Sequence, residues 1–496
     1  MSNLQVRQEK IQVKRKQTNF REFVRDICSW YPFMFYKNNG ISSTIKSNDR
    51  IKVIDHKQYE ITRNQLLSSS DILWSNLFDW LQDLFQTVWL PNIFHFTENE
   101  NSEYANCVLW WKNVYLSFTT IKDIENILYS FSIKTWSRNC INSFMVRDQS
   151  ENIFSSKCIL SSYNIFYSKY IKDSNNIWFS SNLIWCYECI SCDMLQNQSY
   201  CIENKVYDKE TYFSMKKEIM RDKDNFDKRY ELVDTHWENY SSENITRCNY
   251  VVDSNSIENG QYLSDIVQSH NAILVGWGGR GEYVYDCFLN TPPINHIYGG
   301  LSLWTWTEHI YCSMHITSSM NLYYCVFCGD CSFCLGCIGL RNRSYCILNK
   351  QYTKEERYTK VNEIFTQMEK DWQLWEFFPA SMNPFYFNDT AAYLIDPSFT
   401  KEEVTKLWYL RRDEPIKVDI PEWAITVQSS ELAQFESFDE QWNWKLDETV
   451  CKRVILDEHG DAYRIIPMEL EFLQKHGLPL PRKHWLTRMK ENFRIS

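Results

Sequence analysis

The sequence has little glycine and no long stretch of uncharged apolar residues. Glycine accounts for 13 of 496 residues, well below the usual share of about 7%. Four of these glycines lie in VGWGGRGEYVYD at 275–286, where the flanking repeats indicate a loop rather than a phosphate-binding site. The most apolar segment, LFDWLQDLFQTVWL at 77–90, contains Asp79 and Asp83, so we expect no transmembrane helix.

The cysteine content and the net charge also argue against particular classes of protein. The 18 cysteines are too few for a disulfide scaffold, and they cluster at three-residue spacing. We therefore expect free thiols in a reducing, cytoplasmic compartment. The net charge of −10 argues against a surface that coats nucleic acid, although the segments 13–21 and 481–494 are locally basic. The hydrophobic content of 44% argues against a disordered chain.

A short phrase that begins with asparagine returns at nearly constant spacing in the first half of the chain. Successive copies are 13, 13, 13, 12 and 12 residues apart. Looser copies follow between 259 and 321. The opening asparagines of the first run are Asn113, Asn126, Asn139, Asn152, Asn164 and Asn176.

A larger duplication encloses both runs. The segment beginning CYECISCDMLQNQSYC at Cys186 matches the segment beginning CSFCLGCIGLRNRSYC at Cys331, and the same offset relates every matched pair. A Lys/Glu-rich stretch that predicts a capping helix follows each copy. The chain is therefore expected to contain two copies of one unit, each a repeat array closed by a helix.

A period of 12–13 residues predicts a narrow β-solenoid, because helical repeats need about 33–47 residues. Asparagine suits the corners of such coils, since it tolerates left-handed backbone conformation, and it can stack as a ladder from coil to coil. The residues after each asparagine are small or β-branched and should point inward. They are Val114, Ile127, Cys140, Ile153, Ile165 and Ile177.

Four segments resemble an uncharacterised Cys-rich repeat family with Asn-Cys repeats that is abundant in candidate-phyla-radiation bacteria. They are ENSEYANCVLWWKNVYLSF, CLGCIGLRNRSYCILNKQYTKEE, WEFFPASMNPFYFND and YRIIPMELEFLQKHGLPLPRKHW. The resemblance implies zinc-ribbon-like modules on both sides of the arrays, but no established activity. This chain departs from the family by having mostly Asn-Ile or Asn-Val in its first array. Only Cys28 and Cys451 remain near the ends, so we expect degenerate, metal-free ribbons.

The cysteine run CVFCGDCSFCLGC and two histidines are the candidate metal ligands. We expect the thiols to pack as small apolar groups, with a metal site as the alternative. His296 and His309 are one repeat apart and should stack on adjacent coils, but a catalytic zinc needs a third protein ligand. We expect no cofactor, with zinc as the exception. The thiols are Cys325, Cys328, Cys331, Cys334 and Cys337.

A ladder of large apolar residues follows the inward positions of the first array. Strand alternation should turn these side chains outward, where another part of the chain or a partner must cover them. We expect intramolecular cover, with a partner-binding ladder as the sharper alternative. Its members are Tyr115, Leu128, Ile141, Phe154, Phe166 and Trp178.

These patterns predict a mainly β protein of four consecutive segments. They are an N-terminal α/β module (1–100), a first array with its helix (101–230), a second array with its helix (231–370), and a Trp-rich connector with a C-terminal ribbon-like module (371–496). No nucleophile elbow, HExxH or Walker motif is present. We expect a non-catalytic scaffold that binds a protein or itself. The alternatives are a zinc-dependent β-helix enzyme using His296 and His309, and nucleic-acid or ribosome docking through the basic termini.

Overall fold

The computed structural model describes most of the chain, with gaps, and it contains two compact units. The main described ranges are 19–38, 41–62, 76–93, 104–233, 319–374, 376–413 and 420–493. One unit combines Met1–Asn92 with Trp237–Glu414, and the other combines Ile93–His236 with Pro415–Ser496. Each unit therefore joins parts of the chain that are far apart in sequence.

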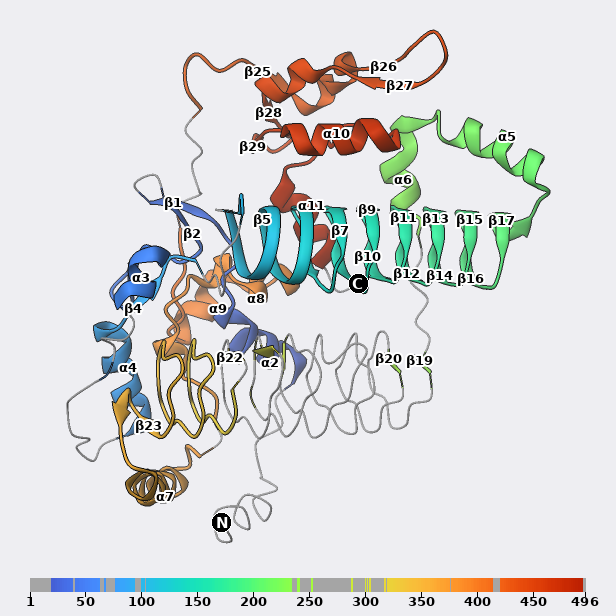
Figure 1. Ribbon diagram of the computed structural model, residues 1–496. Helices are drawn as coiled ribbons and strands as arrows, with labels where there is room; N and C mark the ends of the chain where they lie inside the picture. Colours follow the sequence, from blue (N-terminus) through green and yellow to red (C-terminus); the bar gives the residue numbers. More distant parts are fainter. Residues whose placement is uncertain are drawn as a thin grey trace. The chain divides into compact units, whose positions relative to one another are not determined.

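The unit that contains residues 93–236 is built on a β-solenoid of about eight turns over residues 104–202, drawn as a stack of coils in Figure 1. This confirms the solenoid predicted from the period of the repeat. The strands are β5 (Tyr104–Leu128), β6 (Phe131–Ile133), β7 (Arg138–Ile141), β8 (Phe144–Arg147), β9 (Glu151–Phe154), β10 (Lys157–Leu160), β11 (Tyr163–Phe166), β12 (Lys169–Lys172), β13 (Asn175–Trp178), β14 (Ser181–Ile184), β15 (Tyr187–Ile190), β16 (Asp193–Gln196), β17 (Ser199–Ile202) and β18 (Lys205–Val206).

Two parallel walls make up the coils. Odd-numbered strands from β7 to β17 pair in one wall, even-numbered strands from β6 to β16 pair in the other, and β5 belongs to both. Each strand pairs with the strand one coil away, as Ile165 does with Ile153 and Ile177. The register therefore places equivalent positions of successive coils directly above one another.

Every third residue of these coils adopts left-handed backbone conformation. Asn152, Ser155, Cys158 and Ser161, for example, have φ angles of 58°, 45°, 60° and 47°. The sequence predicted this conformation only for the asparagines. Four such triplets make a coil of 12 residues, and a coil of 13 residues has one extra left-handed position, such as Trp136 after Thr135. The chain therefore turns at short intervals, and the residue that ends each left-handed turn is followed by one that points inward.

The interior of the solenoid alternates between apolar and hydroxyl-bearing columns. The predicted inward residues Val114, Ile127, Cys140, Ile153, Ile165 and Ile177 all belong to its buried core. Between them lie columns of buried serines, in which one serine hydroxyl accepts a hydrogen bond from the backbone N–H one coil later. The distances are 3.1 Å from Ser168 N to Ser156 Oγ and 3.1 Å from Ser180 N to Ser168 Oγ. Most of these hydroxyls also donate to a carbonyl two residues earlier, as Ser168 does to Phe166 O at 2.9 Å.

The asparagines form the ladder that the repeat predicted. Each side-chain amide donates from Nδ2 to Oδ1 of the asparagine one coil later, over distances of 2.8–3.0 Å. The ladder begins at Asn101, one coil before the first asparagine of the predicted run. Its members are Asn101, Asn113, Asn126, Asn139, Asn152, Asn164 and Asn176.

An asparagine side chain closes the last coil. Asn204 accepts from Asp193 N at 2.8 Å and donates to Asp193 O at 2.9 Å. Its side-chain amide thus makes the hydrogen bonds to β16 that a further strand would make. The antiparallel hairpin of β17 and β18 and helix α5 (Lys209–Ile219) follow. Asp208 caps α5 by accepting from Thr211 N at 2.9 Å. The predicted helix after the array is therefore present.

Short helices and strands complete this unit. Helix α6 (Phe226–Glu231) follows α5, and the segment 420–493 contributes a three-stranded sheet, a hairpin and two helices. These elements are η3 (Lys223–Asn225), β25 (Thr426–Gln428), η6 (Ser429–Phe435), β26 (Glu436–Phe438), β27 (Trp444–Leu446), η7 (Glu448–Lys452), β28 (Val454–Leu456), β29 (Ala462–Tyr463), α10 (Pro467–His476) and α11 (Trp485–Phe493).

The other unit combines an N-terminal α/β segment with coils between 319 and 351. Parallel bridges there join residues one coil apart, such as Tyr323 to Leu335 and Leu335 to Ile347. The closing hairpin and helix α7 follow. The elements are α2 (Phe20–Asp26), η1 (Cys28–Trp30), β1 (Tyr36–Asn38), β2 (Ile41–Ser43), β3 (Lys52–Ile54), α3 (His56–Thr62), α4 (Leu77–Thr87), β4 (Trp89–Pro91), β23 (Cys346–Ile347), β24 (Lys350–Gln351), α7 (Lys354–Lys370), η4 (Ala380–Met382), η5 (Phe387–Asp389), α8 (Ala391–Ile395) and α9 (Lys401–Lys406).

The serine columns lead to a stability prediction. Replacing Ser168 with alanine removes the acceptor of the buried Ser180 N–H, and an unsatisfied buried group costs about 1–3 kcal/mol. Ser168→Cys should cost less, because Cys192 already fills the same column and accepts from Asn204 N at 3.4 Å. Urea unfolding measures both changes. Ser199→Ala, at an exposed position, is the control, and equal losses for all three variants would contradict the column's role.

Candidate functional site

The predicted apolar ladder lies on the outer wall of the coils and is covered by helices of the same unit. Phe154 stacks on Phe472 of α10 with ring centroids 6.2 Å apart, and Phe166 contacts His476 at 5.2 Å. Trp178 packs against Phe226 of α6 at 6.0 Å. Leu128, Ile141, Phe154, Phe166 and Trp178 are buried, and Tyr115 is half-buried.

This cover is intramolecular, so the buried ladder is not available as the partner-binding surface that the sequence offered as the alternative. The ladder faces outward from the coils as predicted. Helix α6 and the C-terminal segment that contains α10, both of the same chain, cover it. The sequence contained a signal for this, because α10 itself carries the buried apolar residues Leu470, Phe472 and Leu473. The ladder is therefore an internal interface of the unit.

The five thiols of the cysteine run occupy inward positions of the coils between 319 and 351. All five are buried and free. Their Sγ atoms donate to backbone carbonyls, as Cys325 does to Tyr323 O at 3.4 Å and Cys331 does to Gly329 O at 3.2 Å. The backbone N–H of Cys331 donates to Ser319 Oγ at 3.0 Å, which is the bond that the serine columns of the first array make.

The described part of the chain brings no set of metal ligands together. Within it, no group of three or more Cys, His, Asp or Glu side chains has the arrangement to hold a metal ion. His296 and His309 lie outside the described residues, so the stacked-histidine prediction stays a prediction. Cys28 is buried and Cys451 is partly buried. Burial raises the pKa of both thiols, which disfavours the thiolate that a metal requires.

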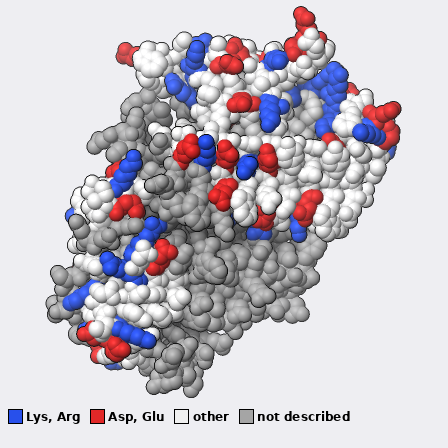
Figure 2. All heavy atoms as spheres, in the orientation of Figure 1, with Lys and Arg blue, Asp and Glu red and all other residues white. Residues whose placement is uncertain are grey.

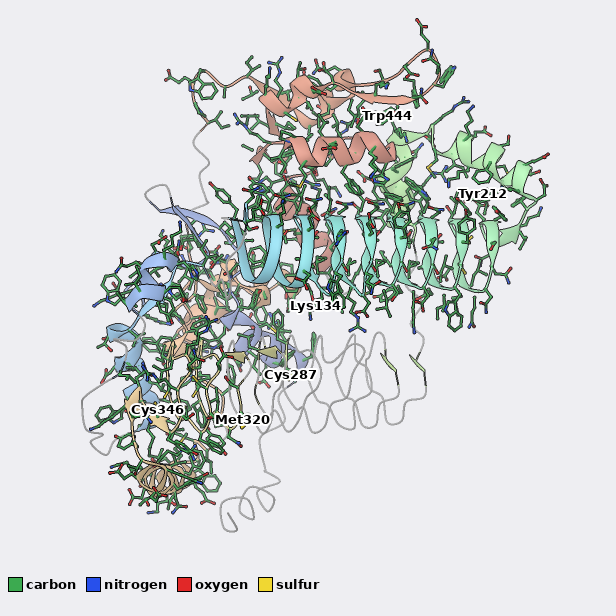
Figure 3. The ribbon with its side chains drawn as sticks, in the orientation of Figure 1. Lys134, Tyr212, Cys287, Met320, Cys346 and Trp444 are labelled. Carbon is green, nitrogen blue, oxygen red and sulfur yellow. The ribbon has the colours of Figure 1, made fainter. Side chains whose placement is uncertain are left out.

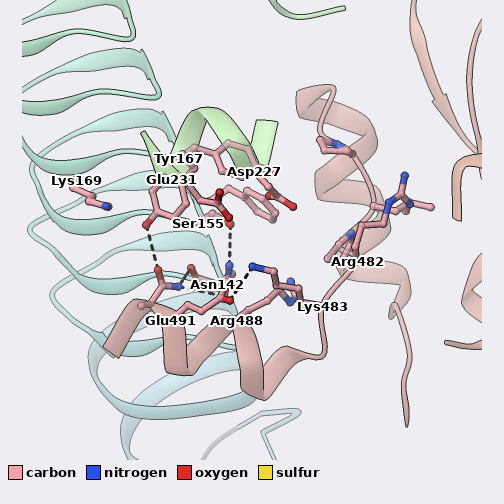
Figure 4. Close-up of a pocket in the computed structure, with 16 residues that line it drawn as sticks. Asn142, Ser155, Tyr167, Lys169, Asp227, Glu231, Arg482, Lys483, Arg488 and Glu491 are labelled. Atoms are coloured by element: carbon pink, nitrogen blue, oxygen red, sulfur yellow. Dashed lines mark hydrogen bonds and ion pairs between the residues drawn. The ribbon is translucent and has the colours of Figure 1, made fainter. Parts of the chain in front are cut away.

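A polar cavity of about 320 Å³ lies between the coils, α6, α11 and the segment 479–483 (Figure 4). Its floor is formed by side chains of the solenoid wall, including Asn142 and Ser155, whose side chains are joined by a 2.8 Å hydrogen bond. Asn492 donates from Nδ2 to Asn142 O at 2.9 Å, and Tyr230 donates to Asn492 Oδ1 at 3.3 Å. This chain of hydrogen bonds links α6 and α11 to the coils.

Most cationic groups around the cavity are already engaged by neighbouring acceptors. Lys483 pairs with Glu491 at 2.8 Å, and Lys169 donates to Val233 O at 3.1 Å. Asp227 also lines the cavity. Nearby protein displaces water and raises the pKa of its carboxyl, and Lys483 opposes the shift. Because the charges largely satisfy one another, the cavity is better suited to joining the helices to the coils than to acid–base catalysis.

Buried charge also joins α11 to α10. Arg488 donates to Glu469 at 3.1 Å, and both side chains are almost fully buried. Burial raises the pKa of Glu469, and Arg488 opposes the shift. Arg482 pairs with Glu436 in the same unit. Three basic side chains of the segment 481–494, those of Arg482, Lys483 and Arg488, thus form ion pairs within the unit.

An exposed aromatic patch on the solenoid was not predicted. It consists of Tyr163, Trp185 and Tyr187, whose exposed fractions are 45%, 53% and 40%. Tyr163 and Tyr187 occupy the same outer column, with Asn175 between them in register, and Trp185 lies at the adjacent corner. Only the column assignment could have revealed the patch, because an intervening repeat separates Tyr163 in the sequence from Trp185 and Tyr187.

Comparisons with known proteins give no relative for this chain. No family model, no curated protein and no solved structure matches it. Among the residues that the structure describes, no helix is both long and apolar enough to cross a membrane.

Two buried histidines in the segment that covers the coils predict that the stability of the fold depends on pH. Burial lowers the pKa values of His476 and His484 to about 4, against about 6.5 when unfolded. The neutral rings therefore stabilise the fold above about pH 6.5, and this stability is lost as the pH falls from about 6.5 to 4, because the unfolded state then binds more protons. Each ring contributes at most about 1.4 kcal/mol per pH unit.

Denaturant unfolding between pH 7 and 4 tests this dependence. His476→Gln and His484→Gln should each reduce the loss of unfolding free energy across that range. His459→Gln, at an exposed position, is the control and should leave the slope unchanged. Identical slopes for all variants would show that the buried histidines do not cause the acid sensitivity.

Proposed function

We propose that this chain is a non-catalytic β-solenoid scaffold that binds a protein partner through the patch of Tyr163, Trp185 and Tyr187. The observation that carries the proposal is the exposure of three large aromatic side chains within three consecutive coils. Aromatic residues of this kind supply most of the binding energy in protein interfaces. The other large apolar surface of the coils, the ladder, is already covered.

The surroundings of the patch favour a protein partner. Its rim is polar, with Ser161, Lys172 and Asn175 exposed, and a polar rim around aromatic anchors is typical of protein interfaces. Coil-to-coil hydrogen bonds fix the backbone beneath the patch, so little conformational entropy would be lost on binding. On the face that Figure 2 shows, charges of both signs are interspersed over the described surface.

We further propose that the coils between 319 and 351 are the end of a second, duplicated array. Asn349 accepts from Ile338 N at 2.8 Å and donates to Ile338 O at 2.9 Å. These are the bonds that Asn204 makes to Asp193, and the offset of the duplication relates both pairs of residues. The shared closing bond supports the duplication, and the relationship to the Cys-rich repeat family with degenerate flanking ribbons is part of the same proposal.

The free cysteines favour a reducing compartment. Fifteen cysteines of the described segments are unpaired, and fourteen of them are buried. An interior filled with thiols is suited to a cytoplasmic location, where glutathione and thioredoxin keep cysteine reduced. The two alternative functions have less support. His296 and His309 lie outside the described residues, and Arg482, Lys483 and Arg488 of the basic segment 481–494 are engaged in ion pairs.

Site-directed crosslinking tests the scaffold function. A photo-crosslinking amino acid at Asn175, between the two tyrosines of the patch, should capture one defined protein in cells. The double variant Trp185→Ala/Tyr187→Ala should reduce that capture at least about tenfold, since truncating an interface hot spot costs about 2 kcal/mol or more.

Trp423→Ala is the matched control, because Trp423 is another exposed tryptophan of the same unit. It should leave the capture unchanged. Light scattering on the purified protein shows whether the captured protein is a second copy of this chain. Unchanged capture by the double variant would overturn the proposal.

A further inference from the structure

The two tyrosines of the exposed aromatic patch lie in one column of the solenoid wall, two coils apart. Tyr163 pairs in register with Asn175, and Asn175 pairs with Tyr187. Since in-register strands are about 4.8 Å apart, the two tyrosine positions are separated by about 9.6 Å along the axis of the coils. Figure 3 shows side chains projecting outward along this stack of coils. The wall thus presents two aromatic side chains at a fixed spacing, on a line that crosses the strands.

This spacing matches one turn of a polyproline II helix. Such a helix has three residues per turn and rises about 3.1 Å per residue, so equivalent side chains recur about every 9.3 Å. Proline-rich segments in this conformation bind to surfaces lined with aromatic residues. Two prolines that are three residues apart can therefore each contact one tyrosine ring, with the peptide lying along the axis of the coils.

The other groups of the patch suit the backbone of such a peptide. A polyproline II helix makes no internal hydrogen bonds, so its carbonyl groups need donors. Asn175 is exposed between the two tyrosines, and its side-chain amide can donate to a carbonyl. Trp185, whose exposed fraction is 53%, lies at the corner two residues before Tyr187 and offers an indole N–H. The patch thus combines rings that can contact proline with donors for the peptide backbone.

Two other modes of peptide binding fit the patch less well. Strand addition needs an open strand edge, but the strands beneath the patch, β11, β13 and β15, are each paired on both sides. An amphipathic helix presents apolar side chains one turn apart, and one turn spans about 5.4 Å. One of those side chains would therefore fall over the polar Asn175, halfway between the rings. The column favours an extended, proline-rich segment.

Two carboxylates border the patch on the side of the earlier coils. Glu151 lies in the column of the tyrosines, one coil before the first of them, and Asp173 lies at the corner one coil before Trp185. Both are half-buried. Arg138 and Lys172, their neighbours in register and in sequence, form no ion pair with them within the described part of the chain. A basic side chain next to the prolines of the peptide would complement these carboxylates.

We propose that the patch binds a proline-rich segment of the partner protein, in polyproline II conformation, with a basic residue beside its prolines. Prolines three residues apart contact Tyr163 and Tyr187, and carbonyls between them accept from Asn175 and Trp185. The basic residue lies toward Glu151. Coils held by hydrogen bonds and a peptide that is already extended both lose little conformational entropy on binding. The inference rests on the proposed partner-binding function of the patch, and it names the chemistry of the partner.

Fluorescence anisotropy with synthetic peptides tests the inference on the full chain. The probe is a labelled decapeptide with an N-terminal arginine, a proline at every third position and alanine elsewhere. A peptide of the same composition with a proline at every fourth position should bind at least about fivefold more weakly, since its prolines cannot contact both rings. Replacing the arginine of the probe with glutamine should weaken binding about two- to fivefold, because exposed ion pairs contribute little. The double variant Glu151→Gln/Asp173→Asn should remove that difference.

Variants of the aromatic residues locate the binding. Tyr163→Ala and Tyr187→Ala should each weaken binding of the probe about tenfold, whereas Tyr163→Phe, which keeps the ring, should retain most of the affinity. Trp136→Ala is the matched control and should leave the affinity unchanged, because Trp136 is an exposed tryptophan of the same array, four coils before Trp185. Far-ultraviolet circular dichroism checks the fold of each variant. Should Tyr163→Ala unfold, Tyr163→Thr, which keeps a β-branched residue in the strand, is the second variant.

Equal affinity for the two proline spacings would overturn the inference, as would unchanged affinity in Tyr163→Ala or Tyr187→Ala. Binding of chitotetraose, or of a second copy of this chain, in place of the peptide would also overturn it. The double variant Trp185→Ala/Tyr187→Ala separates this inference from the function on which it rests. If that variant loses the capture by a crosslinker at Asn175 while no proline peptide binds, the partner-binding function stands and only the proline-rich partner is wrong. Capture that the double variant leaves unchanged removes both.

Discussion

Left-handed backbone conformation at every third residue is the constraint on which the solenoid depends. For residues other than glycine it costs about 1–2 kcal/mol per residue, and the described coils repeat it from Asn113 to Asn204. The asparagine ladder and serine columns offset this cost with hydrogen bonds between coils. Since each bond needs the neighbouring coil, an isolated coil cannot be stable, and the array must form cooperatively.

The same constraint explains the cysteines. At its inward positions a narrow coil has no room for aromatic or long polar side chains and holds small or branched aliphatic ones instead. The hydroxyl columns also need a hydrogen-bonding atom. Cysteine meets both needs: Cys140 and Cys189 continue apolar columns, and Cys192 continues a serine column. The regular three-residue spacing of CVFCGDCSFCLGC therefore follows from the backbone, which turns one residue in three inward.

Periodicity allowed much of the fold to be predicted, but it could not show what covers the coils. The asparagine spacing predicted the solenoid, the ladder and the inward residues, because each depends on contacts at the fixed separation of one coil. The cover by Phe472 and His476 depends on a segment far later in the chain, for which no repeat exists. The aromatic patch was missed because Tyr163 and Tyr187 come into the same column, two coils apart, only after the chain has coiled. The left-handed serines were missed because serine carries no local signal for that conformation.

The closing asparagine has a consequence for how such chains change length. Asn204 and its counterpart Asn349 complete the hydrogen bonds of the last coil with one amide. The described coils before each cap bond to their immediate neighbours, through positions that every coil provides. A gene can therefore gain or lose a whole coil upstream of the cap without creating an unmatched edge. Array length is free to vary in evolution, while the terminal asparagine and the helix after it must stay together.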